Sequence, residues 1–119
     1  MKKIPLYILL TFTIFNIAMA ESVLPKCQGS NVKQWNNCFG TYINNYGEKK
    51  YKYIGEFQNG KYDGQGVMFF LQDDNTYTED HKYTGQFKNG EFHGNGIATV
   101  DGVDHKGIWI NGIWETSRE

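Results

Sequence analysis

The feature that most constrains this chain is an internal repeat of glycine and aromatic residues. The segment YIGEFQNG at residues 53–60 returns as YTGQFKNG at 83–90 and as HKGIWING at 105–112. The first two copies continue alike, into GQG at 64–66 and GNG at 94–96, whereas the third copy has no such glycine pair. Self-similarity at this spacing predicts a row of stacked supersecondary units.

Each copy predicts two antiparallel strands joined by an Asn-Gly turn, because Asn and Gly both tolerate the positive φ that a tight hairpin needs. Alternation along a strand puts the aromatic and glycine positions on one face and the charged and amide side chains on the other. In the first copy Tyr53, Gly55 and Phe57 share a face. The predicted fold class is therefore all-β, an elongated single-layer antiparallel sheet of hairpins.

Stacked copies would align their aromatic residues in two ladders across the sheet, Tyr53 with Tyr83 and His105, and Phe57 with Phe87 and Trp109. Glycines are expected between the ladders where a ring from the adjacent hairpin, or a facing strand, leaves no space for a Cβ. The predicted structural glycines, turn positions included, are Gly55, Gly60, Gly64, Gly66, Gly85, Gly90, Gly94, Gly96, Gly107 and Gly112.

The pattern Tyr-x-Gly-x-Phe-x-x-Gly-x-x-x-Gly-x-Gly at 53–66, repeated at 83–96, resembles the MORN (membrane occupation and recognition nexus) repeat. The resemblance covers residues 53–119 well and 35–52 loosely, with Cys38-Phe39-Gly40 standing where Gly64-Gln65-Gly66 stands later. It implies a slightly twisted sheet of hairpins, used mainly for protein association and with a debated link to phospholipids.

Two departures from the MORN pattern carry further expectations. The step from Gly55 to Gly85 is longer than the step from Gly85 to Gly107, and the excess residues at 69–82 predict a protruding acidic loop. The missing glycine pair after Gly112 marks the third copy as a terminal half repeat, which is expected to act as a C-terminal cap.

The first twenty residues predict a secretory signal peptide. Lys2 and Lys3 precede an apolar run from Ile4 to Ile17, and Ala18-Met19-Ala20 supplies small residues for cleavage. A single membrane anchor is the alternative for this run. The predicted organisation is a signal peptide at 1–20, an N-terminal segment with a degenerate half repeat at 21–52, and a MORN-repeat domain at 53–119, as in a bacterial exported protein.

Charge and cysteine content further limit the possible functions. Removing two lysines from a chain of net charge −1 leaves −3, so no positive surplus predicts nucleic-acid binding. Export places the chain in an oxidising compartment, where paired thiols are oxidised, so Cys27 and Cys38 are expected to form a disulfide. A thiol redox function is the alternative, but it favours a Cys-x-x-Cys pair. Whether residues 21–34 are ordered beyond this disulfide is left open.

The sequence contains no catalytic constellation, and we expect no enzyme activity and no cofactor. The serines lie near the ends of the mature chain, without the strand-turn-helix setting of a hydrolase nucleophile. The acidic loop at 73–80 alternates oxygen ligands as calcium sites do, but it lacks a turn glycine and a complete ligand set. His81, His93 and His105 fall in three different contexts of the repeat, so a zinc site is not expected.

Two surfaces remain as candidate binding sites. Aromatic residues that a single-layer sheet leaves uncovered could bind a protein partner or a second copy, and the candidates are Tyr53, Phe57, Tyr83, Phe87 and Trp109. A basic cluster of Lys49, Lys50 and Lys52 could contact lipid head groups or an acidic partner. The predicted function is a non-enzymatic interaction or scaffolding module, periplasmic or extracellular; the alternative is a peripheral phospholipid-binding protein of the envelope.

Overall fold

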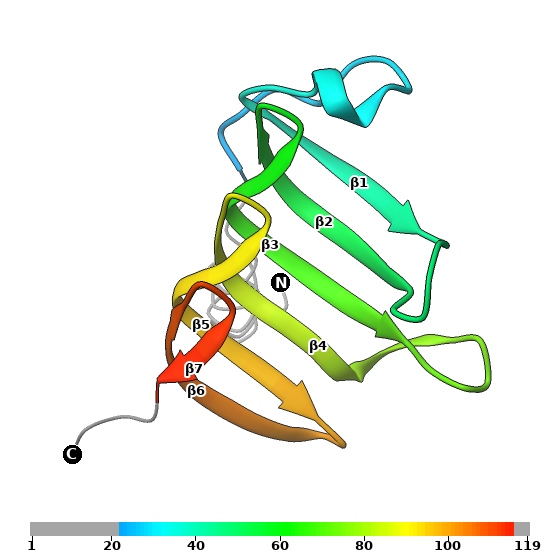
Figure 1. The fold of residues 1–119 in the computed structure, drawn as a ribbon, viewed down its shortest axis with the longest axis vertical. Coiled ribbons are helices and arrows are strands. Elements are labelled where there is room, and N and C mark those ends of the chain that lie inside the picture. Colours follow the sequence, from blue (N-terminus) through cyan, green and yellow to red (C-terminus); the bar gives the residue numbers. More distant parts are fainter. Residues whose placement is uncertain (1–21, 116–119) are drawn as a thin grey trace, which may run out of the picture.

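A computed structural model describes residues 22–115, which form one open antiparallel sheet with its strands in sequence order (Figure 1). This confirms the predicted all-β single-layer sheet. A single 3-10 turn, η1 (Val32–Gln34), precedes the strands. The strands are β1 (Cys38–Asn44), β2 (Tyr51–Gln58), β3 (Lys61–Leu71), β4 (Tyr77–Lys88), β5 (Glu91–Val100), β6 (Val103–Ile110) and β7 (Ile113–Glu115).

The predicted Asn-Gly turns are confirmed. Asn59 and Gly60 have φ of 51° and 74°, and the turns at Asn89 and Asn111 repeat this geometry with their following glycines. A fourth turn of the same kind, Asp101-Gly102, joins β5 to β6. Two consecutive positive φ values match the right-handed twist of the flanking strands, so each turn keeps its two strands paired.

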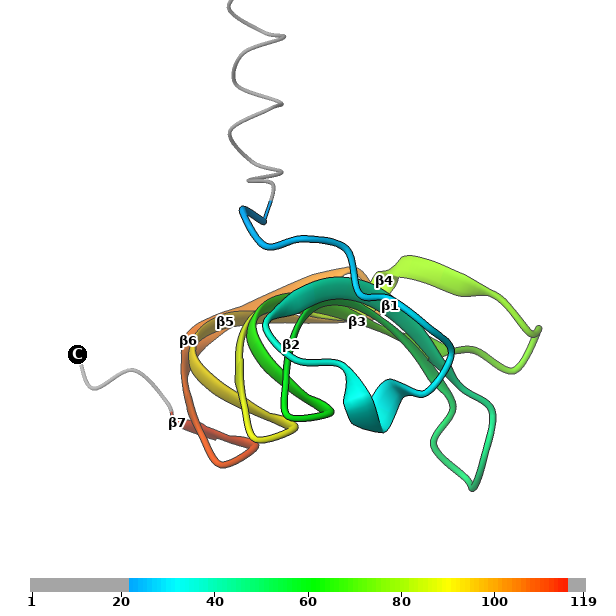
Figure 2. The ribbon, with the colours of Figure 1, turned by 90° about the horizontal axis from the view of Figure 1, so that it is seen from above.

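The sheet curls into a trough, and the hairpin tips bend inward over its inner side (Figure 2). The bend occurs at register shifts between Gly55 and Phe57 in β2 and between Gly85 and Phe87 in β4. A bulge increases the local twist and bends the bulged strand. The tyrosine two residues before each glycine stabilises the bend, because Tyr53 Oη donates to the Glu56 carbonyl at 2.7 Å and Tyr83 Oη to that of Gln86 at 2.9 Å.

The core of this thin sheet is a row of aromatic rings inside the curl. Tyr53 packs edge-on against Phe87 of the next repeat, with ring centroids 5.0 Å apart, and Tyr83 packs in the same way on Trp109 at 5.4 Å. The tyrosine of one repeat therefore contacts the Phe or Trp of the next, so the two predicted ladders interlock instead of running side by side. Edge-to-face pairs of this kind add to the stability gained from burial alone.

Rings lie over Gly55, Gly66, Gly85, Gly96 and Gly107, whereas Gly64 and Gly94 lie against the side chains of Glu56 and Gln86. The structure also corrects where the rings come from. A Cβ at Gly66 would lie 2.6 Å from Cε2 of Tyr53, which belongs to the same hairpin, not to the adjacent one. Gly107 is covered in the same way by Trp114 of its own hairpin. The facing strand also closes in, since a Cβ at Gly55 would lie 2.6 Å from the Gln65 carbonyl oxygen.

The N-terminal segment wraps from the outer side of the trough around the edge of β1 (Figure 2). Ser22 Oγ donates to Glu56 Oε2 on the outer face at 2.9 Å. Cys27 N–H then donates to the Phe39 carbonyl and Phe39 N–H to the Pro25 carbonyl, both at 2.8 Å, which forms a short parallel bridge along β1. The predicted signal peptide at 1–20 lies outside the described residues.

The extra residues at 69–82 do not form the predicted protruding loop. Most of them lengthen β3 and β4 into a projecting hairpin, and the connection itself spans only residues 72–76. Glu79 and Asp80 lie in β4, where Glu79 pairs with Lys82. Because Glu79 and Asp80 lie in a strand, they are not part of a loop that could supply calcium ligands. The expected acidic loop at 73–80 is therefore wrong for these two residues.

Candidate functional site

The predicted aromatic face is the core of the protein. Tyr53 and Tyr83 have no exposed surface, and Phe57 and Phe87 are at most 3 % exposed. A single-layer sheet hides these rings because the bulges curl the hairpin tips over its inner side. Burial therefore removes these four residues from any contact surface of the described fold, and Trp109 lies half-buried at the end of their row.

Sequence reasoning missed the rings that cover this core. Tyr62 stacks on Tyr53 with centroids 4.1 Å apart, and Phe92 stacks on Tyr83 at 3.9 Å. Trp114 has the equivalent position in the third hairpin, but it stacks on Trp109 and lies edge-on to His105. The signal was present, because each of these aromatic residues stands two positions after the glycine of an Asn-Gly turn.

The N-terminal segment supplies a fourth residue to this series. The Gly90 N–H donates to the Tyr62 carbonyl and the Gly112 N–H to the Phe92 carbonyl, both at 2.9 Å, and the Gly60 N–H donates to the Trp35 carbonyl at 2.7 Å. The Trp35 ring also packs edge-on against Phe57 at 4.9 Å. Residues 25–37, which we call the N-terminal cap, therefore take the place of a preceding hairpin tip.

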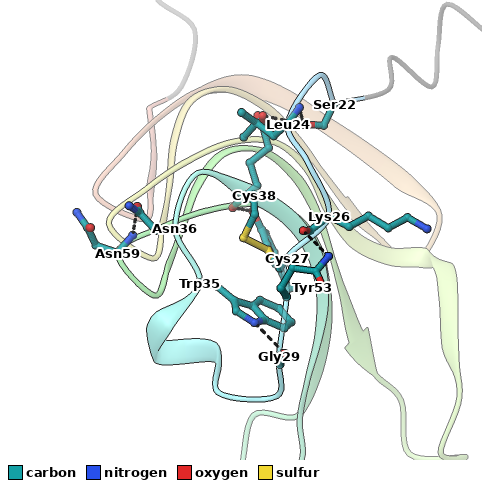
Figure 3. Close-up of a disulfide and its surroundings, with 12 residues drawn as sticks. Ser22, Leu24, Lys26, Cys27, Gly29, Trp35, Asn36, Cys38, Tyr53 and Asn59 are labelled. Atoms are coloured by element: carbon teal, nitrogen blue, oxygen red, sulfur yellow. Dashed lines mark hydrogen bonds between the residues drawn. A yellow bond between two sulfur atoms is a disulfide. The ribbon is translucent and has the colours of Figure 1, made fainter.

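A disulfide between Cys27 and Cys38 attaches the N-terminal cap to β1 (Figure 3), as the cysteine pair predicted. Cys38 is buried against the core. It pairs with Phe57 between β1 and β2, just as Gly64 pairs with Phe87 between β3 and β4. Trp35 and the Cys27 side chain cover Gly40, where an added Cβ would lie 2.8 Å from Trp35 Cζ3. The disulfide thus holds the Trp35 ring over the first repeat.

Replacing Cys27 and Cys38 together with serine should lower the free energy of unfolding by about 3 kcal/mol, because the unfolded chain regains the entropy of a short closed loop. The measurement is a urea unfolding curve of the variant beside that of the wild type. The control is Gln28→Ser, which changes an exposed neighbour of Cys27 and should leave the curve unchanged. A double-serine variant as stable as the wild type would contradict a structural role for the disulfide.

The two ends of the sheet differ in how they are covered. The N-terminal cap hydrogen bonds to β1 and packs on the first repeat, whereas β7 pairs only with Ile108–Ile110 and is exposed along its length. Exposed apolar side chains also lie on β5, β6 and β7, and we call this region the open end: Val100 and Val103 beside the turn from β5 to β6, and Ile108, Ile110, Ile113 and Trp114 beside the turn from β6 to β7. Terminal repeats that close an array present a polar outer face, whereas this one exposes apolar side chains. The expectation of a C-terminal cap is wrong in this respect.

The predicted lysine cluster is divided between two places. Lys52 lies on the outer face of the sheet with its ammonium 5.3 Å from the ring centroid of Phe69 and 5.2 Å from that of Tyr77. Lys49 and Lys50 lie in the exposed connection from β1 to β2, together with Tyr46, which is 79 % exposed. The cation–π contacts explain why Lys52 does not join the other two lysines.

A shallow polar cleft of about 630 Å³ runs between the tips of the first two hairpins. Glu56 and Gln86 line its floor, where their side-chain oxygens accept the backbone N–H groups of Gln65 and Asn95. His93 lies at the rim, with its Nδ1 buried and without a hydrogen-bond partner among the described residues. These contacts fix the bulges, so the polar residues of the cleft have a clear structural role.

The histidines considered for zinc do not form one site. His81 Nε2 lies 2.8 Å from Asp101 Oδ1, His105 packs against Trp114, and His93 lies in the tip cleft. Among residues 22–115, no group of three or more His, Cys, Asp or Glu side chains is arranged to hold a metal ion. Over the same residues no helix has the length and apolar character needed to span a membrane.

Comparison with known proteins agrees with this geometry. The family model of the MORN repeat matches residues 53–70 and 83–99, which span β2 with β3 and β4 with β5. No curated protein matches the chain, and no solved structure does either. MORN repeats are known from modules that bind proteins or membranes, and the MORN repeat family is not an enzyme family. With two matched repeats built from the same turn, bulge and ring-over-glycine contacts, this chain is a MORN repeat protein.

Proposed function

We propose that this protein is an exported, non-enzymatic interaction module that binds a protein partner through the open end of its sheet. The observation that carries the proposal is the concentration of exposed apolar side chains at that end. Six of the large apolar side chains that the described residues expose lie between Val100 and Trp114. Scattered exposed apolar residues need no explanation, but a concentration of them on the last strands of a sheet is typical of a binding surface.

The edge position adds to this argument. An exposed edge strand presents unpaired backbone groups, and proteins usually protect such strands with charge, proline or a covering segment. The N-terminal cap gives that protection to the start of β1, through its hydrogen bonds to Phe39. Ile113 and Trp114 of β7 carry no comparable cover among the described residues. A partner that adds a strand or an apolar surface there would bury side chains worth about 1.5 to 3 kcal/mol each.

Export is supported by the cysteine chemistry. The Cys27–Cys38 disulfide is of the kind that persists in oxidising compartments and is rare in a reducing cytosol. Together with the signal peptide predicted at 1–20, this favours a periplasmic or extracellular location. The partner is then expected among exported or envelope proteins.

The experiment is site-specific photocrosslinking in the native cell envelope. A photoreactive residue at Ile113, on the open end, should capture a specific protein. The matched control is the same probe at Ile43, which is 47 % exposed on β1 at the opposite end and should capture none. Equal capture from both positions, or none from Ile113, would reject the open end as the contact surface.

A second candidate function, contact with an anionic phospholipid surface, is favoured by the connection between β1 and β2. Tyr46, Lys49 and Lys50 are exposed there side by side in sequence, and an amphipathic ring beside two ammonium groups suits a membrane interface. The three-lysine cluster is reduced to two, because Lys52 is held on Phe69 and Tyr77.

Liposome flotation tests this candidate. Binding to anionic vesicles should occur at low salt, weaken as salt increases, and be lost in a Lys49→Gln/Lys50→Gln variant. Lys61→Gln/Lys88→Gln removes two exposed lysines of the hairpin tips and serves as the matched control. No flotation of the wild type at low salt would reject lipid binding.

A further inference from the structure

Within residues 22–115 the sheet has two outer edges, β1 at one end and β6 with β7 at the other. The outer edge of β1 is bonded at Phe39, by the Pro25 carbonyl and the Cys27 N–H, and the N-terminal cap covers that part of it. Head-to-tail stacking of copies needs two different free ends, whereas contact between two identical ends needs only one. Copies of this chain that meet open end to open end therefore form a closed pair related by a two-fold axis.

The free backbone groups at the open end belong to the first half of β6. Because β7 pairs only with Ile108–Ile110, the outer edge of residues 103–107 has no partner strand among the described residues. Residues that flank a two-residue turn exchange both backbone hydrogen bonds, so Ile110 directs its backbone groups toward β7. Alternation then directs the backbone N–H and C=O groups of Lys106 and Asp104 outward in the same way.

The side chains of these two residues make the edge complementary to itself. In an antiparallel pair centred on His105, Asp104 of one copy stands opposite Lys106 of the other, and the reciprocal pair forms by symmetry. Opposite charges directly across a strand pair stabilise it, and like charges destabilise it. Centring the pair on Asp104 or on Lys106 instead would place like charges opposite each other, so only one register is favoured.

Asp104 is already oriented for this contact. Thr99 Oγ1 donates to Asp104 Oδ1 at 2.7 Å, which leaves the second carboxylate oxygen free to accept from an ammonium group. Thr99 is buried, at 7 % exposure, so its hydroxyl fixes the carboxylate from a rigid position. Val103, at 58 % exposure, would lose solvent-exposed apolar surface in the same contact.

We propose that a second copy of this chain docks on the open end by antiparallel pairing of β6 with its symmetry mate, centred on His105 and held in register by reciprocal Asp104–Lys106 pairs. The inference rests on the open end of the proposed function and names one occupant for it. The paired strands would join two seven-stranded sheets into one continuous sheet, with an N-terminal cap at each far end.

Sedimentation equilibrium over a concentration series tests the proposal by charge exchange. The wild type should be a dimer. Asp104→Lys places lysine opposite lysine, and Lys106→Asp places aspartate opposite aspartate, so each should raise the dimer dissociation constant roughly tenfold or more. The double variant Asp104→Lys/Lys106→Asp restores opposite charges and should dimerise again with an affinity close to that of the wild type.

Two controls separate charge from folding. Asp104→Asn keeps an acceptor for the Thr99 hydroxyl and removes only the charge, so it should weaken the dimer while leaving the circular dichroism spectrum unchanged. Lys61→Asp alters an exposed lysine on a distant hairpin tip and should have no effect. A monomeric wild type would overturn the proposal. So would a dimer whose dissociation constant is unchanged by Asp104→Lys, Lys106→Asp and Asp104→Asn. If the Ile113 probe then still captured another protein, the proposed function would stand without the dimer.

Discussion

Replacing Gly66 with alanine should lower the free energy of unfolding by about 3 kcal/mol. The new Cβ would lie 2.6 Å from Cε2 of Tyr53 and 2.8 Å from its Cζ. Tyr53 cannot move aside, because its ring is fully buried, stacked on Tyr62 and packed edge-on against Phe57 and Phe87. Urea unfolding of the variant beside the wild type measures the loss.

Gly47→Ala is the control for this prediction. Gly47 has φ of +75° and no heavy atom within 4 Å of an added Cβ, so alanine there brings backbone strain of about 1 kcal/mol without a clash. The difference between the free energies of unfolding of the two variants isolates the effect of the clash with the Tyr53 ring. Equal losses from Gly66→Ala and Gly47→Ala would show that the ring does not lie over Gly66.

Raising the pH above about 10 should unfold the protein cooperatively, because its buried tyrosines resist ionisation. Burial raises the pKa of Tyr83 to about 12, partly offset by a backbone hydrogen bond from His93. Burial, with the carboxylates of Glu56 and Asp63 nearby, raises the pKa of Tyr53 further. Burial and the hydrogen bond with Tyr51 do the same for the pKa of Tyr62.

The sign of the pH effect follows from these directions. A raised pKa in the folded state means that the unfolded chain loses its phenolic protons first as the pH increases. The stability that these tyrosines contribute is complete below their ordinary pKa of 10.0 and is lost as the pH rises toward their folded values. Each fully buried tyrosine adds a slope of about 1.4 kcal/mol per pH unit in that window.

Absorbance at the tyrosinate band, followed together with circular dichroism, measures this transition. The buried tyrosines, Tyr53 and Tyr83, should ionise in one step with unfolding. Tyr83→Phe keeps the ring but removes the hydroxyl, and it should reduce the slope of stability against pH. Ionisation of every tyrosine near pH 10 with the fold intact would contradict the buried positions.

Local patterns in the sequence were enough to predict the hairpins, their turns and the disulfide. Asn59-Gly60 and its two equivalents predict positive φ directly, because few other dipeptides adopt that geometry without strain. The alternation of Tyr53, Gly55 and Phe57 predicts which side chains share a face. These features depend on neighbours in sequence, so a single chain reveals them.

The curvature of the sheet was not predictable from the same patterns. Period-two alternation assigns a side chain to a face, but it does not show how far that face is covered. The bulges at Glu56 and Gln86 bend the hairpin tips over the core, and this hides the rings that the sequence assigned to a binding surface. The location of the open end also depends on this bend and on the N-terminal cap, which packs on residues far along the chain.

Trp35 shows why the cap was missed. Its role is defined by a hydrogen bond from Gly60 and by ring contact with Phe57, and neither contact lies within a repeat copy that could be aligned by spacing. One extra residue, Asn37 with φ of 50°, separates Trp35 and Asn36 from the repeat pattern that Cys38 and Gly40 follow. An insertion of this size conceals a half repeat from a search by fixed spacing.

The packing of rings over bare backbone supports both the fold and the assignment of the open end as the surface left for binding. Proton NMR of the folded protein tests it directly through the Hα shifts of Gly66 and Gly96, which lie beneath Tyr53 and Tyr83. We predict that both glycines show large ring-current displacements and nuclear Overhauser contacts to those tyrosine rings. Hα shifts at the values of an ordinary strand, without contacts to the rings, would contradict the account.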